Sequence, residues 1–315
     1  MPGKARRRGP EAIVVGSVYC DLIFFDLDGP PALGEEVRTD RFTLTPGGGG
    51  FITAAGLARL GVRTALRTYV GRDLLGRFQL EAMRRGGLDT SQARRHPTLG
   101  TAVSVVFSTR GDRGFLTYKG CAAETGTLLR TWTRASFRKA RHVHFAGIRP
   151  PFKPHLRLLD ALRDAGISTS LDIGWNPAVY GVPAFREVLR RVTVFMPSWQ
   201  DARWFTGRST PDEALRALAE LVALPVVKLG AEGAAALEGG RLVHVRPPRI
   251  DAVETTGAGD AFNAGFIWGR LHGEPLARCL LAGNVCGALS TRAPGGTAAF
   301  PTLRELQAAL RQGRP

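Results

Sequence analysis

The second half of the chain alternates short apolar runs with longer stretches, and this alternation constrains the fold more than any other feature. The apolar runs have the length of buried strands, and the stretches between them have the length and apolar spacing of helices. Strands are expected at 142–145, 168–173, 192–196 and 225–229, and helices at 153–165, 184–190, 211–221, 257–271, 276–290 and 303–312. Repeated strand–helix units of this length predict an α/β fold with a mostly parallel central sheet and helices on both faces.

The first 120 residues begin in the same way but also contain segments that do not fit a parallel layer. A buried strand is expected within 11–25, and further elements are a helix at 51–60, a strand at 64–70 and a helix at 73–85. Residues 41–44 alternate in polarity, and 101–107 and 113–118 have the pattern of an antiparallel pair that turns at 110–112. We therefore predict a small β-lid with segments near 19–46 and 98–120, and a separate hairpin at 234–245.

The length suits one large α/β domain or two small ones, since the chain has 315 residues. We find no internal repeat and no low-complexity linker that would separate two domains. We predict a flexible basic arm at 1–10 and a single domain over 11–315.

The formal charge of +16 by itself suggests a nucleic-acid binder. However, only five of the 43 basic residues are lysines, and the arginines are scattered over the whole chain. This pattern is typical of a compositional bias rather than of an interface. We expect no specific nucleic-acid partner.

The four cysteines have no CxxC spacing, so neither a disulfide scaffold nor a zinc site is expected. Cys279 and Cys286 lie in an apolar helical stretch, where buried thiols are the rule. No apolar run reaches the roughly 18 residues that span a bilayer, and no secretory pattern follows the basic start. We expect a cytoplasmic protein without a membrane partner.

The segment at 254–265 is the one that most clearly suggests chemistry. Gly257-Ala258-Gly259 forms a turn that opens an apolar helix, so backbone N–H groups and the helix dipole can bind an anion there. Asp260 follows in the first helical turn, where it can take a proton from a hydroxyl that attacks a phosphoryl group. A capped helix with an acidic dipole partner is the structural alternative.

This segment resembles the C-terminal signature DTTGAGDAF of the ribokinase-like (PfkB) carbohydrate kinases. Other parts of the chain are similar to further motifs of that family and follow at the expected intervals: Gly16-Ser17 with Asp21, Gly34-Glu35, the glycines at 46–50 before an Ala-rich helix, Asp172 with Asn176-Pro177, and Lys228–Gly233. The resemblance covers about residues 12 to 303. It implies a ribokinase-like sandwich with a β-lid, and an ATP-dependent carbohydrate kinase that uses Mg²⁺ and dimerises through the lid.

The resemblance also implies roles for individual residues. Asp260 would be the catalytic base, and the amides of Gly257, Ala258 and Gly259 would bind the γ-phosphate. The acceptor would lie against Asp21, Gly48, Gly49 and the position of Ile52. The nucleotide would contact Ser198, Lys228, Gly230, Glu232, Gly233 and Asn284, and Asp201 would support the metal through water.

Several positions depart from the family pattern. Ile52 stands where an asparagine is common, so a hydrogen bond to a sugar hydroxyl is lost there. Ser198 and Asp201 replace the Asn and Glu of Asn-x-x-Glu, and both remain oxygen donors suited to hydrated Mg²⁺. Where ribokinase has an acidic residue that binds the sugar, this chain has His144–Gly147. We therefore expect an acceptor other than ribose. Glu254 replaces an aspartate of the family, so the sequence does not decide whether the family's monovalent-cation site is present.

The leading interpretation is an ATP-dependent kinase for a hydroxyl of a small sugar or sugar derivative. A nucleoside kinase is an alternative, because Phe24, Phe25, Phe107 and Tyr118 near the lid could stack on a base or form the apolar face of the lid. A non-catalytic sugar or nucleotide sensor is another alternative, although a sensor has no need of Asp260.

Overall fold

The computed structural model describes residues 9–109, 113–174 and 176–312. Most of the arm expected at 1–10 and the turn expected at 110–112 lie outside the described residues. Within the described part, no helix is both long and apolar enough to cross a membrane.

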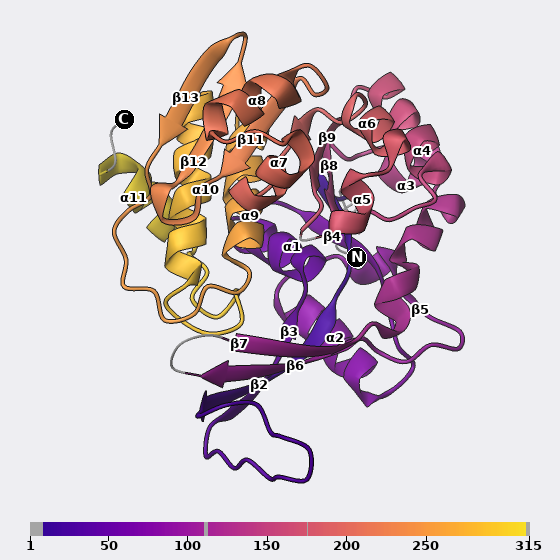
Figure 1. Cartoon of the computed structure of the whole chain (residues 1–315). Helices are drawn as coiled ribbons and strands as arrows, with labels where there is room; N and C mark the ends of the chain where they lie inside the picture. The colour runs from indigo at the N-terminus through magenta and orange to yellow at the C-terminus, as the bar shows by residue number, and fades with distance from the viewer. Residues whose placement is uncertain (1–8, 110–112, 175, 313–315) are drawn as a thin grey trace, which may run out of the picture.

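A nine-stranded sheet forms the centre of the molecule (Figure 1). Its order is β13-β12-β11-β10-β9-β8-β1-β4-β5. The strands are β1 (Ala12–Gly16), β4 (Thr64–Val70), β5 (Ala93–Arg95), β8 (His142–Ala146), β9 (Ser168–Asp172), β10 (Val194–Phe195), β11 (Leu224–Lys228), β12 (Ala234–Glu238) and β13 (Arg241–Val245). All neighbours are parallel except β11–β12 and β12–β13, so the prediction of a mostly parallel sheet is confirmed.

Helices cover both faces of this sheet, because alternate residues of β1 belong to two different cores. Val14 packs with α1 (Gly49–Arg59), α9 (Ala258–Leu271), α10 (Leu276–Ser290) and α11 (Leu303–Gln312). Ile13 and Val15 pack with α4 (Lys153–Asp164), α6 (Pro183–Leu189), α7 (Trp199–Thr206) and α8 (Pro211–Ala219). The remaining helices are α2 (Leu74–Arg85), α3 (Arg134–Phe137), α5 (Pro177–Tyr180) and the 3₁₀ helices η1 (Thr90–Gln92), η2 (Gly120–Thr131) and η3 (Gly230–Glu232). A central strand buried on both faces is what a parallel sheet between helical layers requires.

A second, four-stranded sheet projects from one end of the molecule (Figure 1). Its order is β3-β2-β6-β7, with β2 (Tyr19–Leu27), β3 (Phe42–Gly47), β6 (Val103–Thr109) and β7 (Arg113–Tyr118). The antiparallel pairs β2–β3 and β6–β7 agree with the expected lid segments, and β2 joins β6 in parallel. We call this element the small sheet.

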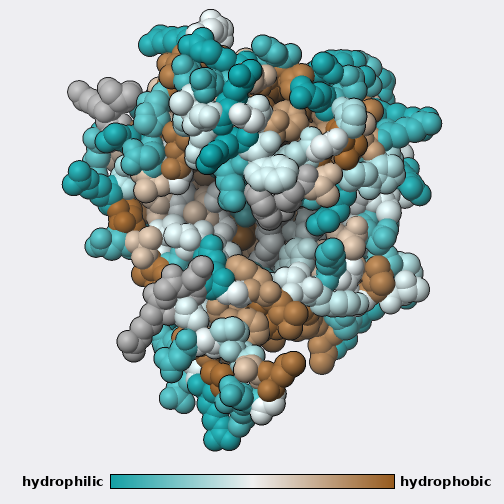
Figure 2. Space-filling view, in the orientation of Figure 1, coloured by the Kyte–Doolittle hydropathy of each residue, from teal (hydrophilic) through white to brown (hydrophobic). Residues whose placement is uncertain are grey.

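The two outer strands of the small sheet carry exposed apolar side chains, and apolar residues gather over this end in Figure 2. Phe42 on β3 and Phe115 on β7 are both 54% exposed, and Leu44, Leu116 and Tyr118 are exposed as well. Outer strands of this kind can pair with or pack on another chain.

The four cysteines are buried as free thiols, which confirms the expectation for Cys279 and Cys286. Cys279 and Cys286 lie in the core that contains α9 and α10, whereas Cys20 belongs to β2 and Cys121 to η2. They therefore act as small apolar side chains.

Candidate active site

The turn before α9 has the backbone conformation that an anion site needs. Gly257 is the N-cap with φ +76°, which favours glycine, and a Cβ there would lie 2.6 Å from Cδ1 of Ile52. The N–H of Ala258 already donates to the carbonyl of Thr255 at 3.2 Å. The N–H groups of Gly257 and Gly259 make no hydrogen bond within the described chain. These two of the three predicted amides therefore have no hydrogen-bond acceptor among the described residues, as an anion site at a helix N-terminus requires.

Asp260 follows this turn and faces helix α1. A Cβ on Gly49 would lie 2.7 Å from Oδ1 of Asp260, so the glycine lets the helix approach the carboxylate. Thr53 Oγ1 donates to the backbone carbonyl of Asp260 at 3.2 Å and fixes α1 against α9. Burial raises the pKa of Asp260 to about 7, with the charge of Asp172 adding to the rise and that of Lys228 opposing it. A carboxyl group with this pKa can exchange a proton near neutral pH.

Three side chains from three elements form a polar network beside Asp260. Lys228 Nζ at the end of β11 lies 2.5 Å from Oδ2 of Asp172 at the end of β9. Asn263 Nδ2 on α9 donates to the same oxygen at 2.6 Å. Burial opposes ionisation of Asp172, but the charge of Lys228 and these hydrogen bonds outweigh it and lower the pKa of the carboxyl group. Asp172 is therefore ionised and Lys228 is tied to it.

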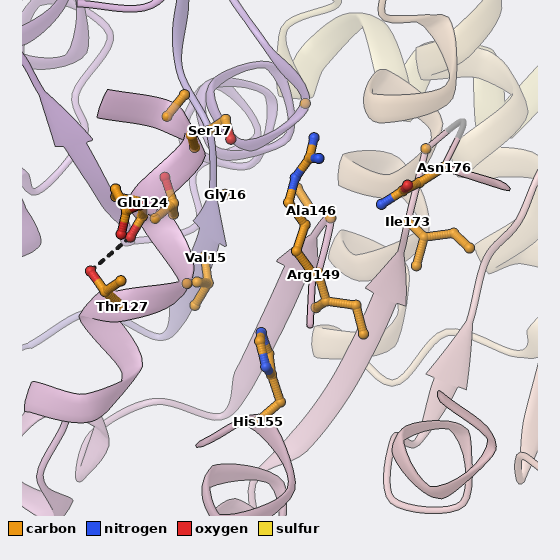
Figure 3. A pocket seen from close by; sticks show the side chains of 18 of the residues that line it. Val15, Gly16, Ser17, Glu124, Thr127, Ala146, Arg149, His155, Ile173 and Asn176 are labelled. Atoms are coloured by element: carbon orange, nitrogen blue, oxygen red, sulfur yellow. Dashed lines mark hydrogen bonds between the residues drawn. The ribbon is translucent and has the colours of Figure 1, made fainter. Parts of the chain in front are cut away.

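A cavity of about 480 Å³ opens from Asp260 and Gly49. One wall comes from the end of β1 and from Tyr19, the second from η2, and the third from the loops that follow β8 and β9 (Figure 3). Ala146, Gly147, Asp172 and Asn176 line it as well. The cavity thus lies at the carboxyl ends of parallel strands, where α/β folds bind ligands.

Asp21 lies near this cavity but does not line it. Its side chain is packed against Gly47, where a Cβ would collide with Oδ2 of Asp21. Asp21 is 7% exposed and makes no side-chain hydrogen bond to any residue that the structure describes. Burial raises its pKa to about 7, and the charge of Glu254 adds to the rise.

Ile52 and Gly48 occupy positions different from those expected. Ile52 is 2% exposed and packs under Gly257 and Gly296, so its side chain supports the anion-binding turn and is not among the residues that line the cavity. Gly48 has φ +87°, and a Cβ there would lie 2.9 Å from the carbonyl of Ser17 and from Tyr19. These two residues shape the site by packing.

Four of the residues expected at the nucleotide, Gly230, Glu232, Gly233 and Asn284, lie near one another around the β11–β12 turn and β13, whereas Ser198 lies at the start of α7. A Cβ on Gly233 would collide with the carbonyl of Val245, and Asn284 Nδ2 donates to that carbonyl at 2.7 Å. Glu232 accepts from His244 through its backbone carbonyl at 2.8 Å, and Gly230 begins the same turn. Lys228 instead points to Asp172 and Asn263.

Ser198 and Asp201 form a capping box at the start of α7. Both oxygens of Asp201 are engaged, since Oδ2 accepts from the backbone and hydroxyl of Ser198 and Oδ1 accepts from the hydroxyl of Tyr180. No cluster of three or more His, Cys, Asp or Glu that could hold a metal occurs within the described residues.

Glu254 joins the small sheet to the anion-binding turn. Its carboxylate forms an ion pair with Arg113 on β7 and accepts from the backbone N–H groups of Thr256 and Gly295. Arg113 and two backbone N–H groups thus already bind the carboxylate of Glu254, the residue on which the undecided monovalent-cation site depends.

The sequence did not indicate Asn263 in the polar network, Tyr180 beside Asp201, or Arg149, which also lines the cavity. Asn263 lies in the apolar part of α9, and Tyr180 and Arg149 lie in segments without a recognisable motif. Asn263 follows Asp260 by three residues, so helical spacing would have placed the two on neighbouring faces.

The fold and the site together define an α/β kinase of the ribokinase-like class. A family model described as "pfkB family carbohydrate kinase" matches residues 10–303. The chain belongs to this family and is a carbohydrate kinase.

Two curated relatives illustrate the range of the family. The 2-dehydro-3-deoxygluconokinase of Bacillus subtilis (strain 168) is 31% identical over 276 residues, which cover 82% of this chain and 84% of the relative. The fructokinase of Escherichia coli is 27% identical over 282 residues, which cover 83% and 91%.

Solved structures share the fold. A putative ribokinase from Agrobacterium tumefaciens superposes with a TM-score of 0.85 at 24% identity and covers 96% of this chain and 98% of that one. A putative ribokinase II from E. coli in complex with ATP and Mg²⁺ gives a TM-score of 0.84 at 22% identity, with coverage of 96% and 100%. These likenesses confirm the ribokinase-like fold.

Proposed function

We propose that this kinase transfers the γ-phosphoryl group of ATP to a hydroxyl of a small sugar or sugar derivative bound in the cavity next to Asp260. One observation carries the proposal. The carboxyl group of Asp260 has a pKa near 7 and lines the cavity. It directly follows the turn in which the N–H groups of Gly257 and Gly259 have no acceptor among the described residues.

In the proposed reaction the acceptor oxygen forms a bond to the γ-phosphorus, and the bond from this phosphorus to the β–γ bridging oxygen breaks. The hydroxyl proton goes to Asp260, and ADP leaves with the bridging oxygen. The amides of Gly257 and Gly259 stabilise the charge on the transferred group, since they are fixed before the reaction starts. Asp21 and the small sheet would hold and cover the acceptor and so exclude water, which competes as a phosphoryl acceptor.

Lys228 has a supporting role in this proposal. Its ammonium group opposes the rise in the pKa of Asp260 that burial and Asp172 cause. It thereby keeps part of the Asp260 population ionised at neutral pH, when the base is needed. A Cβ on Gly259 would lie 3.3 Å from Nζ of Lys228. The ammonium group of Lys228 therefore places a positive charge beside the turn.

We further propose that Mg²⁺ enters with the phosphates of ATP. Mg²⁺ commonly keeps several waters and binds through substrate phosphates and few protein groups. The engaged oxygens of Asp201 support this route.

The nucleoside-kinase alternative has less support. Phe24, Phe25, Phe107 and Tyr118 do not line the cavity, and Phe24 instead packs on Phe42 with ring centroids 5.1 Å apart. The sensor alternative does not account for the pKa of Asp260. The names of the relatives denote kinases of a sugar acid and of a neutral sugar, so both acceptor classes stay open at this level.

The test is a panel of sugars, sugar acids and nucleosides assayed for ADP release with Mg-ATP. We expect rapid release with a sugar or sugar acid and none above background with nucleosides. Release with nucleosides alone would favour the nucleoside-kinase alternative. No release with any acceptor, combined with tight binding of one, would favour the sensor.

We also propose that two copies pair through the small sheet. The exposed apolar side chains on its outer strands support this arrangement. Sedimentation equilibrium of the wild type and of Phe115→Asp is the test, and a monomeric wild type would contradict it.

A further inference from the structure

Arg149 brings a guanidinium group to the wall of the acceptor cavity, where its side chain is exposed to solvent. It belongs to the loop between β8 and α4, and it lines the same cavity as Asp260. Figure 3 shows its side chain between Gly16 and Ser17 on one wall and Ile173 and Asn176 on the other. Its charge also reaches Tyr19, where it partly opposes the rise in the pKa of the phenol that burial causes.

The charge of Arg149 has no ionic partner in the part of the chain that the structure describes. It makes no salt bridge or side-chain hydrogen bond to any described residue. Three acids line the cavity: Asp172 is bound to Lys228 and Asn263, Asp260 is the proposed base, and Glu124 lies on the opposite wall. A cation inside a binding cavity without a partner favours an anionic ligand group.

The other ionisable groups of the cavity do not alter this balance. Glu124 and Arg130, one acid and one base, both belong to η2 on the opposite wall. Burial lowers the pKa of His155 to about 4, so its ring is neutral at pH 7. Arg149 is therefore a cation that a ligand can meet on the wall formed by the loop after β8.

A second donor faces the same space. Asn176 precedes α5, and its side chain makes no capping hydrogen bond. In Figure 3 its amide points from the opposite wall toward the side on which Arg149 lies. A guanidinium and a neutral amide from two walls match a planar group with a single negative charge, because together they offer several donors and one compensating charge.

We infer that the acceptor carries a carboxylate, which Arg149 and Asn176 bind while a hydroxyl at the other end of the molecule lies at Asp260. The substrate class is thus a sugar acid. This inference rests on the proposed kinase function and narrows its acceptor. Arg149 acts on specificity and takes no part in proton transfer.

The test compares kcat/KM for a sugar acid and a neutral sugar at saturating Mg-ATP. Suitable probes are 2-dehydro-3-deoxygluconate and fructose, with fructose 6-phosphate as a probe for a phosphate group. We expect the wild type to prefer the sugar acid at least tenfold, roughly the value of one charge-assisted contact. Arg149→Met should lower kcat/KM for the acid by about 10- to 100-fold, mainly through KM, and leave fructose nearly unchanged.

Two further variants make the result specific. Arg149→Lys keeps the charge without the planar fork and should restore only part of the activity with the acid. Arg157→Met removes the same charge from α4 outside the acceptor cavity and should not change the preference.

The outcomes separate this inference from the kinase function. Preference for fructose or fructose 6-phosphate, or an equal loss for acid and neutral sugar in Arg149→Met, would overturn the inference and leave the kinase function standing. If Mg-ATP is not consumed with any sugar or sugar acid, the proposed function and the inference both fail.

Discussion

Lys228 Nζ lies 2.5 Å from Oδ2 of Asp172 and 3.4 Å from Oδ1 of Asn263, so the cation at the end of β11 is held near the turn that precedes Asp260. The three residues come from β11, β9 and α9, and they meet only because these elements are adjacent in the fold. Their charges set the pKa of Asp260 in opposite directions, since Asp172 raises it and Lys228 lowers it.

Lys228→Met should move the pH dependence of the reaction. In the wild type kcat/KM should rise with pH through about 7, as Asp260 loses its proton. Without Lys228 the carboxylate of Asp172 is no longer offset, so the pKa of Asp260 increases and the rise should shift upward by about one unit or more. Measured pH profiles are the check, with the exposed Lys153→Met as control. An unchanged rise would contradict the role of Lys228.

Gly49→Ala should reduce turnover without unfolding the protein. The added Cβ would lie 2.7 Å from Oδ1 of Asp260, so the carboxylate must move away from the acceptor. A displacement of this size in a reacting group costs up to about a hundredfold in kcat. The matched control is Gly181→Ala, where a Cβ meets nothing within 4 Å. Equal kcat values for the two variants, measured by ADP release, would show that the contact is unimportant.

Arg113→Ala should weaken the closure of the small sheet over the acceptor. The ion pair with Glu254 connects β7 to the loop before the catalytic turn, and Glu254 is only 12% exposed. Loss of a partly buried pair worth about 1 kcal/mol should raise the acceptor KM roughly fivefold.

The control for Arg113 is Arg41→Ala, which removes an exposed pair with Asp26 at the outer end of the same sheet. This variant should keep the wild-type KM. A similar rise in both variants would mean that the ion pair with Glu254 does not couple the sheet to the site.

Ser198→Ala tests the capping box at α7. We expect the free energy of unfolding to fall by about 1 kcal/mol, as for other N-cap side chains. Thr210→Ala, which removes the same type of cap from α8, should have a similar effect. Because Mg²⁺ is proposed to enter with ATP, neither variant should change the Mg²⁺ concentration that gives half-maximal rate. A large increase for Ser198→Ala alone would restore a metal-supporting role for the Ser198–Asp201 motif.

Much of the fold could be predicted from the sequence, because most elements have a strong local pattern. β4, α10 and α11 have the predicted bounds. The helix α1 begins at Gly49 rather than at 51, since Gly50 packs directly on the backbone of Gly16, a contact that composition does not reveal. The pattern also missed α7 and η2. The capping box that starts α7 was interpreted only as a metal motif, and η2 has little periodicity.

The parallel pairing of β2 with β6 lies beyond local prediction for a different reason. It joins Cys20 to Val103, and such a contact depends on where the main sheet places the two segments. The same limit applies to the site. The turn and Asp260 are contiguous and could be predicted, whereas Lys228 and Asp172 are 56 residues apart and meet only in the folded chain.

The central claim is that Asp260 is the base for phosphoryl transfer, and Asp260→Asn tests it most directly. The measurement is kcat with the best acceptor at saturating Mg-ATP, together with ATP affinity, and the exposed Asp251→Asn in the preceding loop is the control. We expect kcat to fall at least about a hundredfold, the scale of lost general-base catalysis, with ATP affinity largely retained and the control unaffected. Near-wild-type turnover in Asp260→Asn would contradict the account.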